Sequence, residues 1–487
     1  MSMRNSSKTL LMTFGAVLAL SGCGGGADRV ASPGEGSFSP PPTTPPPPTS
    51  PPPPPPAAGP APTCPTGFTD AGVIANLRNC QLPQTIIGNL LVPQRAGTIY
   101  SLSGRVDVGQ DQGGNVASPT AGAQSGRLTI EPGVRLFGSG GLDYLVVNRG
   151  SQLFAEGTAT QPIVFTSRQS VEGTTNVDSI GQWGGIVLLG RAPISNCPGT
   201  TTPGTPNCEA QVEGTNAFYG GNSATDNTGR IRYVRVQHSG FQILPNNELN
   251  GITLAGLGSG TVFEYVQVHN SSDDGFEWFG GTVNAKYLVG TGNDDDTFDT
   301  DVGFNGAIQF GVVVQRAGGG DRMNEMSGSN RIPASNPKIA NVTYVGRAGG
   351  GAGIVMNTST NSRFYNIVMT RPAGGTGAAQ ACLDVDDANT TGSFNSVFFS
   401  CPTAFDDDAN GAAAALFNAG TNNTANGTST LVNTFINGAN ENGVTAFANL
   451  ASISPFFVQV SHIGGVRNAS DTWWQGWTCG LTAATPC

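Results

Sequence analysis

The chain has 487 residues, of which 70 are glycine, 33 are proline and only 11% are charged, against about 25% in an ordinary soluble domain. This composition excludes a typical helical or α/β enzyme, because strong helix formers are scarce and lysine occurs only at Lys8, Lys286 and Lys338. The net charge of -10 argues against nucleic acid as a partner, since phosphate backbones are bound by clustered Lys and Arg.

Residues 1–22 are expected to form a secretory signal peptide. Arg4 and Lys8 supply its positive region, and Leu10–Leu20 is an apolar stretch too short to span a bilayer as a mature helix. The segment ends in Leu20-Ser21-Gly22-Cys23, which resembles the processing box of bacterial lipoproteins. A plain leader that ends before an ordinary cysteine is the alternative.

The resemblance implies that Cys23 is acylated and becomes the new N-terminus. Acyl chains on one residue bury many methylene groups, so the membrane would be a permanent partner without a transmembrane helix. Gly24–Gly26 follow Cys23 where an Asp would favour retention in the inner membrane of enterobacteria. We therefore expect a lipid-anchored protein of the outer membrane, at the cell surface or on the periplasmic face.

Residues 23–63 are expected to form a disordered stalk. Proline runs mark this segment from Ser32 to Thr63, including Pro45–Pro48 and Pro51–Pro56, and such runs adopt polyproline II because they lack ladder donors and apolar surface. About thirty residues at about 3.1 Å each would hold the next domain on the order of 90 Å from the lipid. A proline-rich ligand for another domain is the alternative function.

Eight cysteines remain after Cys23, and they fall into neighbouring couples. An even number of cysteines in an exported chain predicts disulfides, and local pairing is the simplest connectivity. Metal binding is the weaker interpretation, because no couple has the two-residue spacing of a zinc knuckle. The expected pairs are Cys64 with Cys80, Cys197 with Cys208, Cys382 with Cys401, and Cys479 with Cys487.

The sequence pattern of residues 64–487 predicts many short β-strands. Each segment is rich in Val, Ile, Phe and Tyr and is bounded by Gly, Asn, Asp or Ser. The expected strands include Leu128–Glu131, Tyr144–Asn148, Ile163–Ser167, Gly185–Leu189, Ile231–Gln237, Phe263–His269, Ala285–Gly290, Ile308–Gln315, Ile339–Val345, Phe364–Thr370 and Ser393–Phe399.

An internal repeat predicts how these strands are arranged. Asp273-Asp274-Gly275-Phe276-Glu277 recurs 22 positions later as Asp295-Asp296-Thr297-Phe298-Asp299, and Ala285–Leu288 aligns with Ala307–Phe310 at the same spacing. A repeat of this length indicates stacked coils whose strands pair at about 4.8 Å and whose inward residues form ladders. An antiparallel sandwich is the competing all-β fold.

Three motifs carry a resemblance to a family. Thr129-Ile130-Glu131-Pro132-Gly133, Ala155–Ser167 and Gly181–Gly190, which contains Trp183, are similar to segments of right-handed parallel β-helix lipoproteins of Gram-negative bacteria, and the likeness extends to Trp477. It implies an all-β, right-handed parallel β-helix with no generally assigned activity, sometimes encoded beside TonB-dependent outer-membrane receptors.

One region concentrates acidic residues in a chain otherwise poor in charge. If Phe276 and Phe298 point inward, Glu277 and Asp299 point outward on adjacent coils, and Asn324 beside an inward Met323 continues their line. Carboxylates about 4.8 Å apart repel each other by roughly 1 kcal/mol in water and about 3–4 kcal/mol at an effective dielectric near 20, which favours a bound cation, with Ca²⁺ the natural candidate. The expected ligands are Glu277, Asp299, Asp273, Asp274, Asp295, Asp296, Asp301 and Asn324.

The same residues support other interpretations. Asp-rich turns also cap coils and remain hydrated without any ion. A calcium-dependent polysaccharide lyase would use an arginine or lysine as base. Arg316 and Arg322 are the candidates, and Lys286 also lies near the acidic region in sequence. A glycoside hydrolase would use paired carboxylates. Aligning Tyr233 with Tyr265 places His238 against Asn270 rather than His269, so the two histidines are expected to be turn residues rather than a metal pair.

We therefore expect a noncatalytic, surface-displayed lipoprotein that acts in binding or adhesion. Long repeating faces suit extended ligands such as polysaccharides. An accessory role beside a TonB-dependent outer-membrane receptor is implied by the resemblance alone.

Overall fold

The computed structural model describes residues 59–244, 247–374, 380–406, 411–482 and 484–487. The expected signal peptide, Cys23 and the stalk as far as residue 58 lie outside these residues. The backbone N–H of Ala61 donates to Gly97 O at 2.9 Å, and Ala61 O accepts from Arg78 Nε, so the packed domain begins before Cys64. In the described ranges, no helix is long and apolar enough to cross a membrane.

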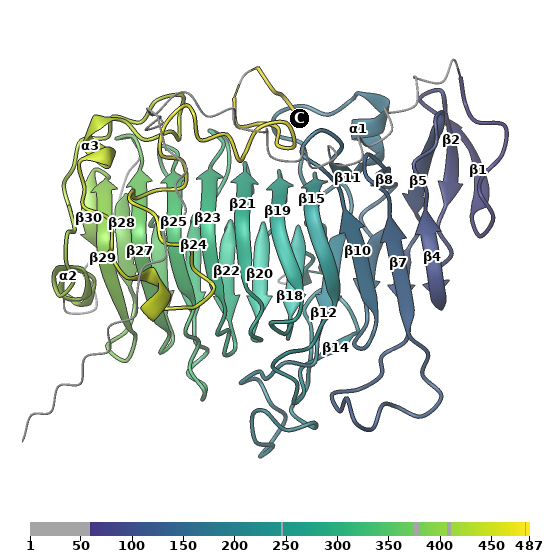
Figure 1. Cartoon of the computed structure of the whole chain (residues 1–487), viewed down its shortest axis with the longest axis horizontal. Helices are drawn as coiled ribbons and strands as arrows, with labels where there is room; N and C mark the ends of the chain where they lie inside the picture. The colour runs from purple at the N-terminus through teal and green to yellow at the C-terminus, as the bar shows by residue number, and fades with distance from the viewer. Residues whose placement is uncertain (1–58, 245–246, 375–379, 407–410, 483) are drawn as a thin grey trace, which may run out of the picture. The chain divides into compact units, whose positions relative to one another are not determined.

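Two long sheets make up the body of the domain, and β-strands lie side by side along its whole length (Figure 1). The 15-stranded sheet contains β1 (Thr69–Ile74), β2 (Leu77–Gln81), β4 (Gly88–Val92), β5 (Thr98–Leu102), β7 (Gly126–Ile130), β8 (Arg135–Gly138), β10 (Gln152–Glu156), β11 (Ile163–Ser167), β15 (Gly229–Gln237), β19 (Val262–His269), β21 (Ala285–Thr291), β23 (Ala307–Val314), β25 (Lys338–Val345), β27 (Asn361–Thr370) and β29 (Thr391–Ser400).

The second sheet has 11 strands. They are β3 (Thr85–Ile86), β6 (Arg105–Val108), β9 (Tyr144–Val147), β12 (Gly185–Leu189), β18 (Ile252–Ala255), β20 (Phe276–Phe279), β22 (Phe298–Asp301), β24 (Asn324–Ser327), β26 (Ile354–Asn357), β28 (Ala381–Val385) and β30 (Thr403–Asp406). Within these two sheets every pair is parallel except β1 with β2.

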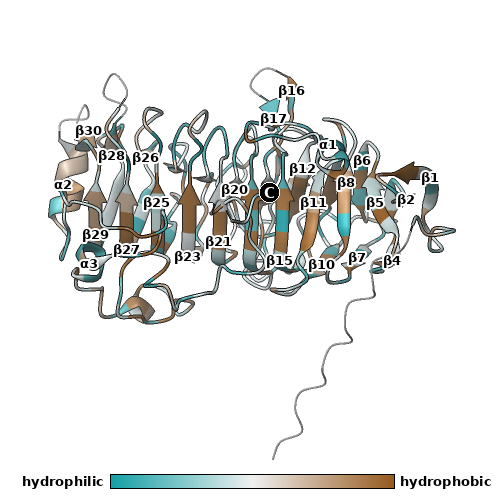
Figure 2. Cartoon of the chain, turned by 90° about the horizontal axis from the view of Figure 1, so that it is seen from above, coloured by the Kyte–Doolittle hydropathy of each residue, from teal (hydrophilic) through white to brown (hydrophobic). Residues whose placement is uncertain are grey.

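The remaining elements are short. Two hairpins leave the body as side loops. They are β13 (Ala210–Gln211) with β14 (Phe218–Tyr219), and β16 (Gln242–Leu244) with β17 (Asn247–Glu248), and Figure 2 shows the second of them. The helices are α1 (Arg168–Glu172), α2 (Ala412–Asn418), α3 (Ala439–Asn442) and a 3₁₀ turn at Leu450–Ser452.

From β18 onward the chain alternates between the two sheets, so each coil adds one strand to each sheet and pairs with the coils on either side. This arrangement is a right-handed parallel β-helix. The fold predicted from the repeat is confirmed, and the antiparallel sandwich is wrong.

Interior ladders hold the coils together. Phe276 pairs with Phe298 in register, both side chains are fully buried, and their ring centroids lie 5.7 Å apart. Trp183 fits against Gly138, where a Cβ would come within 2.6 Å of the Trp183 Cβ, so only glycine allows this approach. The burial of stacked apolar side chains of this kind stabilises the coils through the hydrophobic effect.

Two details of the predicted register are wrong. Lys286 pairs with Gln309, and Leu288 pairs with Gly311, which is a spacing of 23 rather than 22 because the loop before β23 is one residue longer. Asn324 pairs with Phe298 and Glu325 with Asp299. Asn324 is therefore an interior ladder residue between Phe298 and Ile354 and is not a metal ligand.

Asn324 yields a stability prediction. It is 0% exposed, and neither atom of its amide has a hydrogen-bond partner. An unpaired buried polar group costs about 1–3 kcal/mol, so we expect Asn324→Val to raise the thermal unfolding midpoint. Asn437→Val is the matched control, because the Asn437 amide donates to Ile463 O at 2.7 Å and its loss should lower the midpoint. A lower midpoint for Asn324→Val would show that the interior amide is satisfied in solution.

The long strands bend at a column of residues with positive φ. Tyr233, Tyr265, Tyr287 and Phe310 have φ between 51° and 62°, which is unusual for bulky residues. Their rings stack with centroids 4.4, 4.3 and 5.0 Å apart, and this packing offsets the conformational strain.

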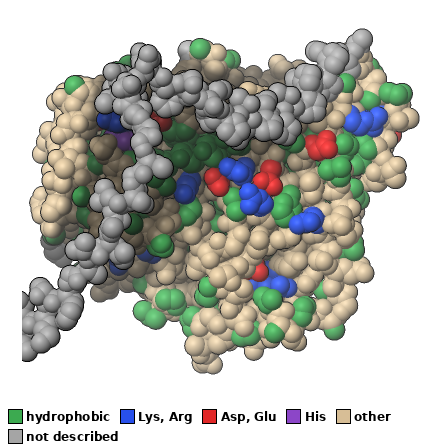
Figure 3. All heavy atoms as spheres, viewed as in Figure 1, with side chains coloured by type: hydrophobic (Ala, Val, Ile, Leu, Met, Phe, Trp, Pro, Cys, Tyr) green, Lys and Arg blue, Asp and Glu red, His purple; other side chains and the backbone are tan. Residues whose placement is uncertain are grey.

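Residues 431–482 and 484–487 form a C-terminal strap along the 15-stranded sheet (Figure 1). Trp477 is fully buried and packs edge-on against Tyr233 and Tyr265, with both centroids at 6.0 Å. Gln267 exchanges two hydrogen bonds with the Cys479 backbone, at 2.6 and 2.9 Å. Side chains of the sheet thus fix the strap through its main chain. On the part of this face that Figure 3 leaves uncovered, a few basic and acidic side chains lie next to one another.

The four expected disulfides are present. Cys64 bonds to Cys80, Cys197 to Cys208, Cys382 to Cys401 and Cys479 to Cys487. In chain order, these disulfides cross-link the first coil, a side loop, the last coils and the end of the strap.

Candidate metal centre

A cavity of about 580 Å³ lies on the outer side of the 11-stranded sheet. We call it the acidic cleft. Ten of its twelve lining residues carry a carboxyl group, and the full lining is Glu213, Gln242, Glu248, Ser272, Asp273, Asp274, Glu277, Asp294, Asp295, Asp296, Asp299 and Glu325.

Stacked coils supply most of these carboxylates. Glu277, Asp299 and Glu325 lie opposite one another on β20, β22 and β24, so neighbouring backbones place them about 4.8 Å apart. The turns before β20 and β22 add Asp273, Asp274 and Asp294–Asp296. Coil-to-coil bonds fix these turns, because the Asp296 N–H donates to Asp274 Oδ1 at 3.0 Å and the Gly275 N–H donates to Asp296 O at 2.8 Å.

The side loops close the cleft from outside. Glu213 lies between β13 and β14, and Glu248 lies in β17. The acidic floor is therefore largely removed from water: Asp274 and Glu277 are each 7% exposed and Asp296 is 3% exposed. The side chain of Asn250 donates to Glu277 Oε2 at 2.5 Å, while Asp299 Oδ1 has no hydrogen-bond partner.

Within the described residues, three sets of carboxylates could hold an ion. In each set the oxygen atoms lie within 4.8 Å of one another. The sets share Asp274 and Asp295, so they form one continuous surface. They are Asp273, Asp274 and Asp295; Asp274, Glu277 and Asp299; and Asp295, Asp296 and Asp321.

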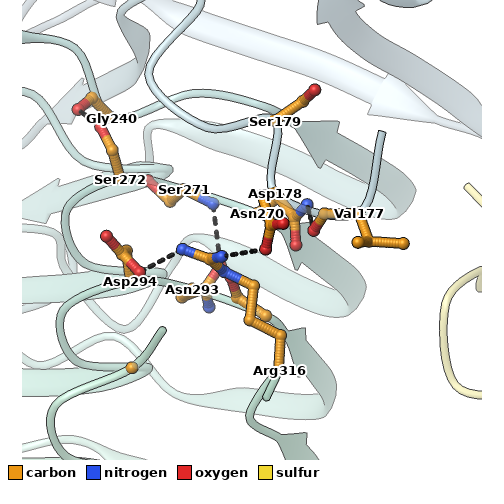
Figure 4. Close-up of polar contacts among 12 residues, drawn as sticks. Val177, Asp178, Ser179, Gly240, Asn270, Ser271, Ser272, Asn293, Asp294 and Arg316 are labelled. Carbon is orange, nitrogen blue, oxygen red and sulfur yellow. Dashed lines mark hydrogen bonds and ion pairs between the residues drawn. The ribbon is translucent and has the colours of Figure 1, made fainter. Parts of the chain in front are cut away.

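Positive charge in the cleft comes mainly from Arg322. Its Nη1 lies 2.8 Å from Asp321, 3.1 Å from Glu325 and 4.0 Å from Asp296. Arg316 binds Asp294 at the edge of the cleft and extends to Asp178 at 2.7 Å on the other side (Figure 4). Two guanidinium groups thus face ten carboxylates, and both already have acidic partners.

The imbalance raises carboxyl pKa values. Burial and the nearby Asp295 raise the pKa of Asp273 to about 8. Burial, followed by repulsion from Asp299, raises the pKa of Asp274 and Glu277 well above the usual range. Burial and the neighbouring Glu325 do the same for Asp296 and Asp299. Near neutral pH the cleft therefore retains protons or takes up a cation.

The family model of the pectate-lyase-like β-helix domain matches residues 101–478. The chain belongs to this family. No curated protein and no solved structure matches the chain at a significant level. The match spans every coil that lines the acidic cleft and most of the strap, and it confirms the parallel β-helix family that the sequence motifs predicted.

Within this pectate-lyase-like β-helix, the structure brings together six of the eight expected ligands: Asp273, Asp274, Glu277, Asp295, Asp296 and Asp299. Asn324 points inward and Glu325 takes its place. Asp301 lies in a neighbouring cavity of about 530 Å³, where both of its carboxylate oxygens accept from the Ser329 hydroxyl at 2.6 and 2.8 Å. Asp301 therefore lies beside Ser329 and not among the carboxylates of the acidic cleft.

Neither arginine proposed as a catalytic base is free. Arg316 and Arg322 are paired with carboxylates. Burial lowers the pKa of Arg322, but Glu325, Asp296 and Asp321 together raise it above its usual value. An arginine base must lose a proton before it accepts one, and these contacts oppose that loss.

Sequence reasoning missed Glu213 and Glu248. They lie far from the acidic region in the chain and reach the cleft only because the hairpins fold back over β20. Nothing in their local sequence distinguishes them from other loop acids.

The alignment of the histidines is as expected, since Gln237 pairs with His269 and places His238 opposite Asn270. The imidazole rings are nevertheless neighbours, with centroids 5.6 Å apart, and they lie outside the acidic cleft.

Proposed function

We propose that this protein is a noncatalytic binding module that holds divalent cations, Ca²⁺ above all, in the acidic cleft and uses them to bind acidic polysaccharide. The observation that carries the proposal is the set of ten carboxylates opposed mainly by Arg322. Calcium accepts six to eight oxygen ligands in flexible geometry, which matches a surface of overlapping carboxylate sets better than a fixed tetrahedral site does.

The cation would also explain how an acidic cleft binds an acidic ligand. Three protein carboxylates leave part of the calcium coordination sphere open, and uronate carboxylates could fill it. Asp295 is exposed and belongs to two of the sets, so it marks the side from which such a ligand would approach.

The sequence supports a location for this activity. A lipid anchor at Cys23 and a proline-rich stalk would present the β-helix at the outer membrane, where polysaccharides are abundant, with or without a TonB-dependent receptor as partner. Membrane fractionation of the Cys23→Ser variant tests the anchor. We expect this variant to be released from the membrane or to accumulate as an unprocessed precursor. A variant that fractionates and migrates like the parent would contradict it.

Binding to polygalacturonate tests the function. We expect the purified protein to be retained on this polymer in calcium and released by chelator, with no retention on neutral dextran. Glu277→Gln with Asp299→Asn should abolish retention. Glu156→Gln with Glu264→Gln is the matched control, because these acids pair with Arg230 and Arg232 on the other sheet. Retention that survives chelation would contradict the proposal.

Hydrolysis is the second candidate, favoured by neighbouring carboxyl groups with raised pKa values. The same samples should be assayed for new reducing ends and unsaturated products. Either product, lost in Glu277→Gln with Asp299→Asn, would replace the binding module with an enzyme.

A further inference from the structure

The cavity that contains Asp301 adjoins the acidic cleft, and we call it the side cavity. It measures about 530 Å³, and Glu213 lines both cavities. Glu277 and Asp299 lie in the acidic cleft. Phe279 and Asp301 follow two residues later on the same paired strands, β20 and β22, and line the side cavity. Two residues of a strand span about 7 Å, so a single extended ligand would reach both cavities.

Bonds between remote segments hold the walls of the side cavity in place. The disulfide between Cys197 and Cys208 closes the loop that leads into β13. The Gly214 N–H donates to Asn247 Oδ1 at 2.7 Å, and this bond joins the two hairpins that cover the sheet. The side cavity is therefore a fixed feature of the fold, in the size range of small-molecule sites.

An aromatic side chain forms the main apolar part of the lining. Phe279 is half-buried and lines the side cavity, so part of its ring remains open to a ligand. Tyr219, which is 1% exposed, packs against this ring with centroids 5.9 Å apart and restricts its movement. A fixed and partly open ring suits a flat apolar surface, such as the C–H face of a pyranose sugar.

Polar atoms with unused hydrogen-bonding capacity accompany this ring. Asp301 Oδ1 accepts from the Val302 N–H and the Ser329 hydroxyl, but among the described residues Oδ2 accepts from Ser329 alone, so Oδ2 keeps a lone pair. Asn247 Nδ2 and the Arg331 guanidinium have no partner among those residues. Asn247 is half-buried, Arg331 is exposed, and no nitrogen of either side chain is among the buried atoms that lack a partner. These donors are therefore accessible from the side cavity.

Charge in the side cavity favours a neutral ligand. Glu213 and Asp301 line it with Arg331, and in the part of the chain that the structure describes neither acid belongs to a carboxylate set that could hold an ion. A uronate would therefore be repelled by two carboxylates with no cation to bridge them, and an ammonium group would be repelled by Arg331. A neutral sugar avoids both penalties, and its hydroxyl groups both donate and accept.

We propose that the side cavity binds a neutral pyranose residue that neighbours, in the same polysaccharide chain, the uronate held through the cation in the acidic cleft. The inference rests on the function proposed above and narrows its ligand to polysaccharides that alternate uronic acids with neutral sugars. The neutral residue packs on Phe279, donates a hydroxyl to Asp301 and accepts from Asn247 or Arg331. The bound chain follows β20 and β22, across the long axis of the β-helix.

Saturation-transfer NMR of the full-length protein in chelator tests the side cavity without the cation. The probes are N-acetylglucosamine, glucosamine and glucuronate, which are neutral, cationic and anionic pyranoses. We expect transfer to N-acetylglucosamine alone, with a dissociation constant on the order of 1 mM. Phe279→Leu removes the ring but keeps apolar bulk, and it should weaken binding about tenfold. Arg331→Gln, at an exposed position, should also weaken binding. Phe154→Leu is the matched control, because Phe154 is a half-buried aromatic residue on the other sheet.

Polymers in calcium test whether the two cavities act together. Hyaluronan alternates glucuronate with N-acetylglucosamine, whereas polygalacturonate has a uronate at every position. We expect hyaluronan to bind about tenfold more tightly than polygalacturonate. Phe279→Leu should remove this preference and leave the calcium-dependent retention of polygalacturonate intact.

The two arms separate failure of the side cavity from failure of the acidic cleft. Absence of N-acetylglucosamine binding in chelator, stronger binding of glucosamine or glucuronate, or equal affinity for the two polymers would overturn the inference even if calcium retains polygalacturonate. If N-acetylglucosamine binds but calcium retains neither polymer, the neutral subsite is supported and the cation-bridged uronate is contradicted.

Discussion

In chelator, we expect the thermal midpoint to fall as the pH rises from 6.5 to 8.5. Carboxyl groups of the acidic cleft have pKa values raised above those of the unfolded chain, with Asp273 at about 8. The folded state therefore binds more protons than the unfolded state in this window, and its stability decreases as the pH passes through the folded pKa. Each carboxyl group that is protonated in the folded state and ionised in the unfolded state lowers the free energy of unfolding by about 1.4 kcal/mol for each unit that the pH rises.

The pH window isolates the carboxyl groups. The pKa values of His238, His269 and His462 are lowered by burial, so their linkage to stability acts mainly below pH 6.5. Excess calcium should flatten or reverse the slope, because the ion replaces protons in the cleft. Glu277→Gln with Asp299→Asn should reduce the slope in chelator. A midpoint that is constant or rises with pH in chelator would show that the cleft is hydrated and uncoupled from folding.

The second large effect is expected from Trp477→Ala. Removal of a fully buried tryptophan costs about 3–5 kcal/mol, and Trp477 is the residue through which the strap contacts Tyr233 and Tyr265. Because its contacts join the strap to the sheet, we expect the strap to loosen before the coils unfold.

Hydrogen exchange shows whether this variant unfolds only in the strap or throughout the domain. Amides of the strap should lose protection from exchange, while those of β19, β21 and β23 should keep it. Trp474→Ala is the control, since Trp474 is half-buried and packs on Phe435 within the strap itself. Equal loss of protection in strap and coils would show that the strap is part of one cooperative unit.

Strand periodicity and turn residues were enough to predict the β-helix. Ile163–Ser167 and Gly185–Leu189 coincide with β11 and β12, because buried parallel strands are continuous runs of apolar residues bounded by turns. The Phe276 and Phe298 ladder follows from the same repeat. Loop length is under weaker constraint than strand pattern, so the 22-residue alignment failed between β21 and β23, where the spacing is 23.

The candidate site was predictable only in part. Alternation along a strand placed Glu277 and Asp299 correctly, but it could not decide between Asn324 and Glu325, because an interior asparagine without partners violates the pattern used to find inward positions. Contacts between remote segments, such as Gln267 with Cys479 or the arrival of Glu213 at the cleft, depend on tertiary packing and leave no local signal.

Calcium titration by isothermal calorimetry tests the central claim most directly. We expect saturable binding at pH 7.5, with an apparent enthalpy that depends on the ionisation enthalpy of the buffer, because calcium displaces protons from carboxyl groups with raised pKa values. A site filled at 100 times its dissociation constant would add about 2.7 kcal/mol to the free energy of unfolding. Binding should be lost in Glu277→Gln with Asp299→Asn and retained in Glu156→Gln with Glu264→Gln. Absence of binding to the parent protein, or equal binding by both double variants, would contradict the assignment of the acidic cleft as a cation site.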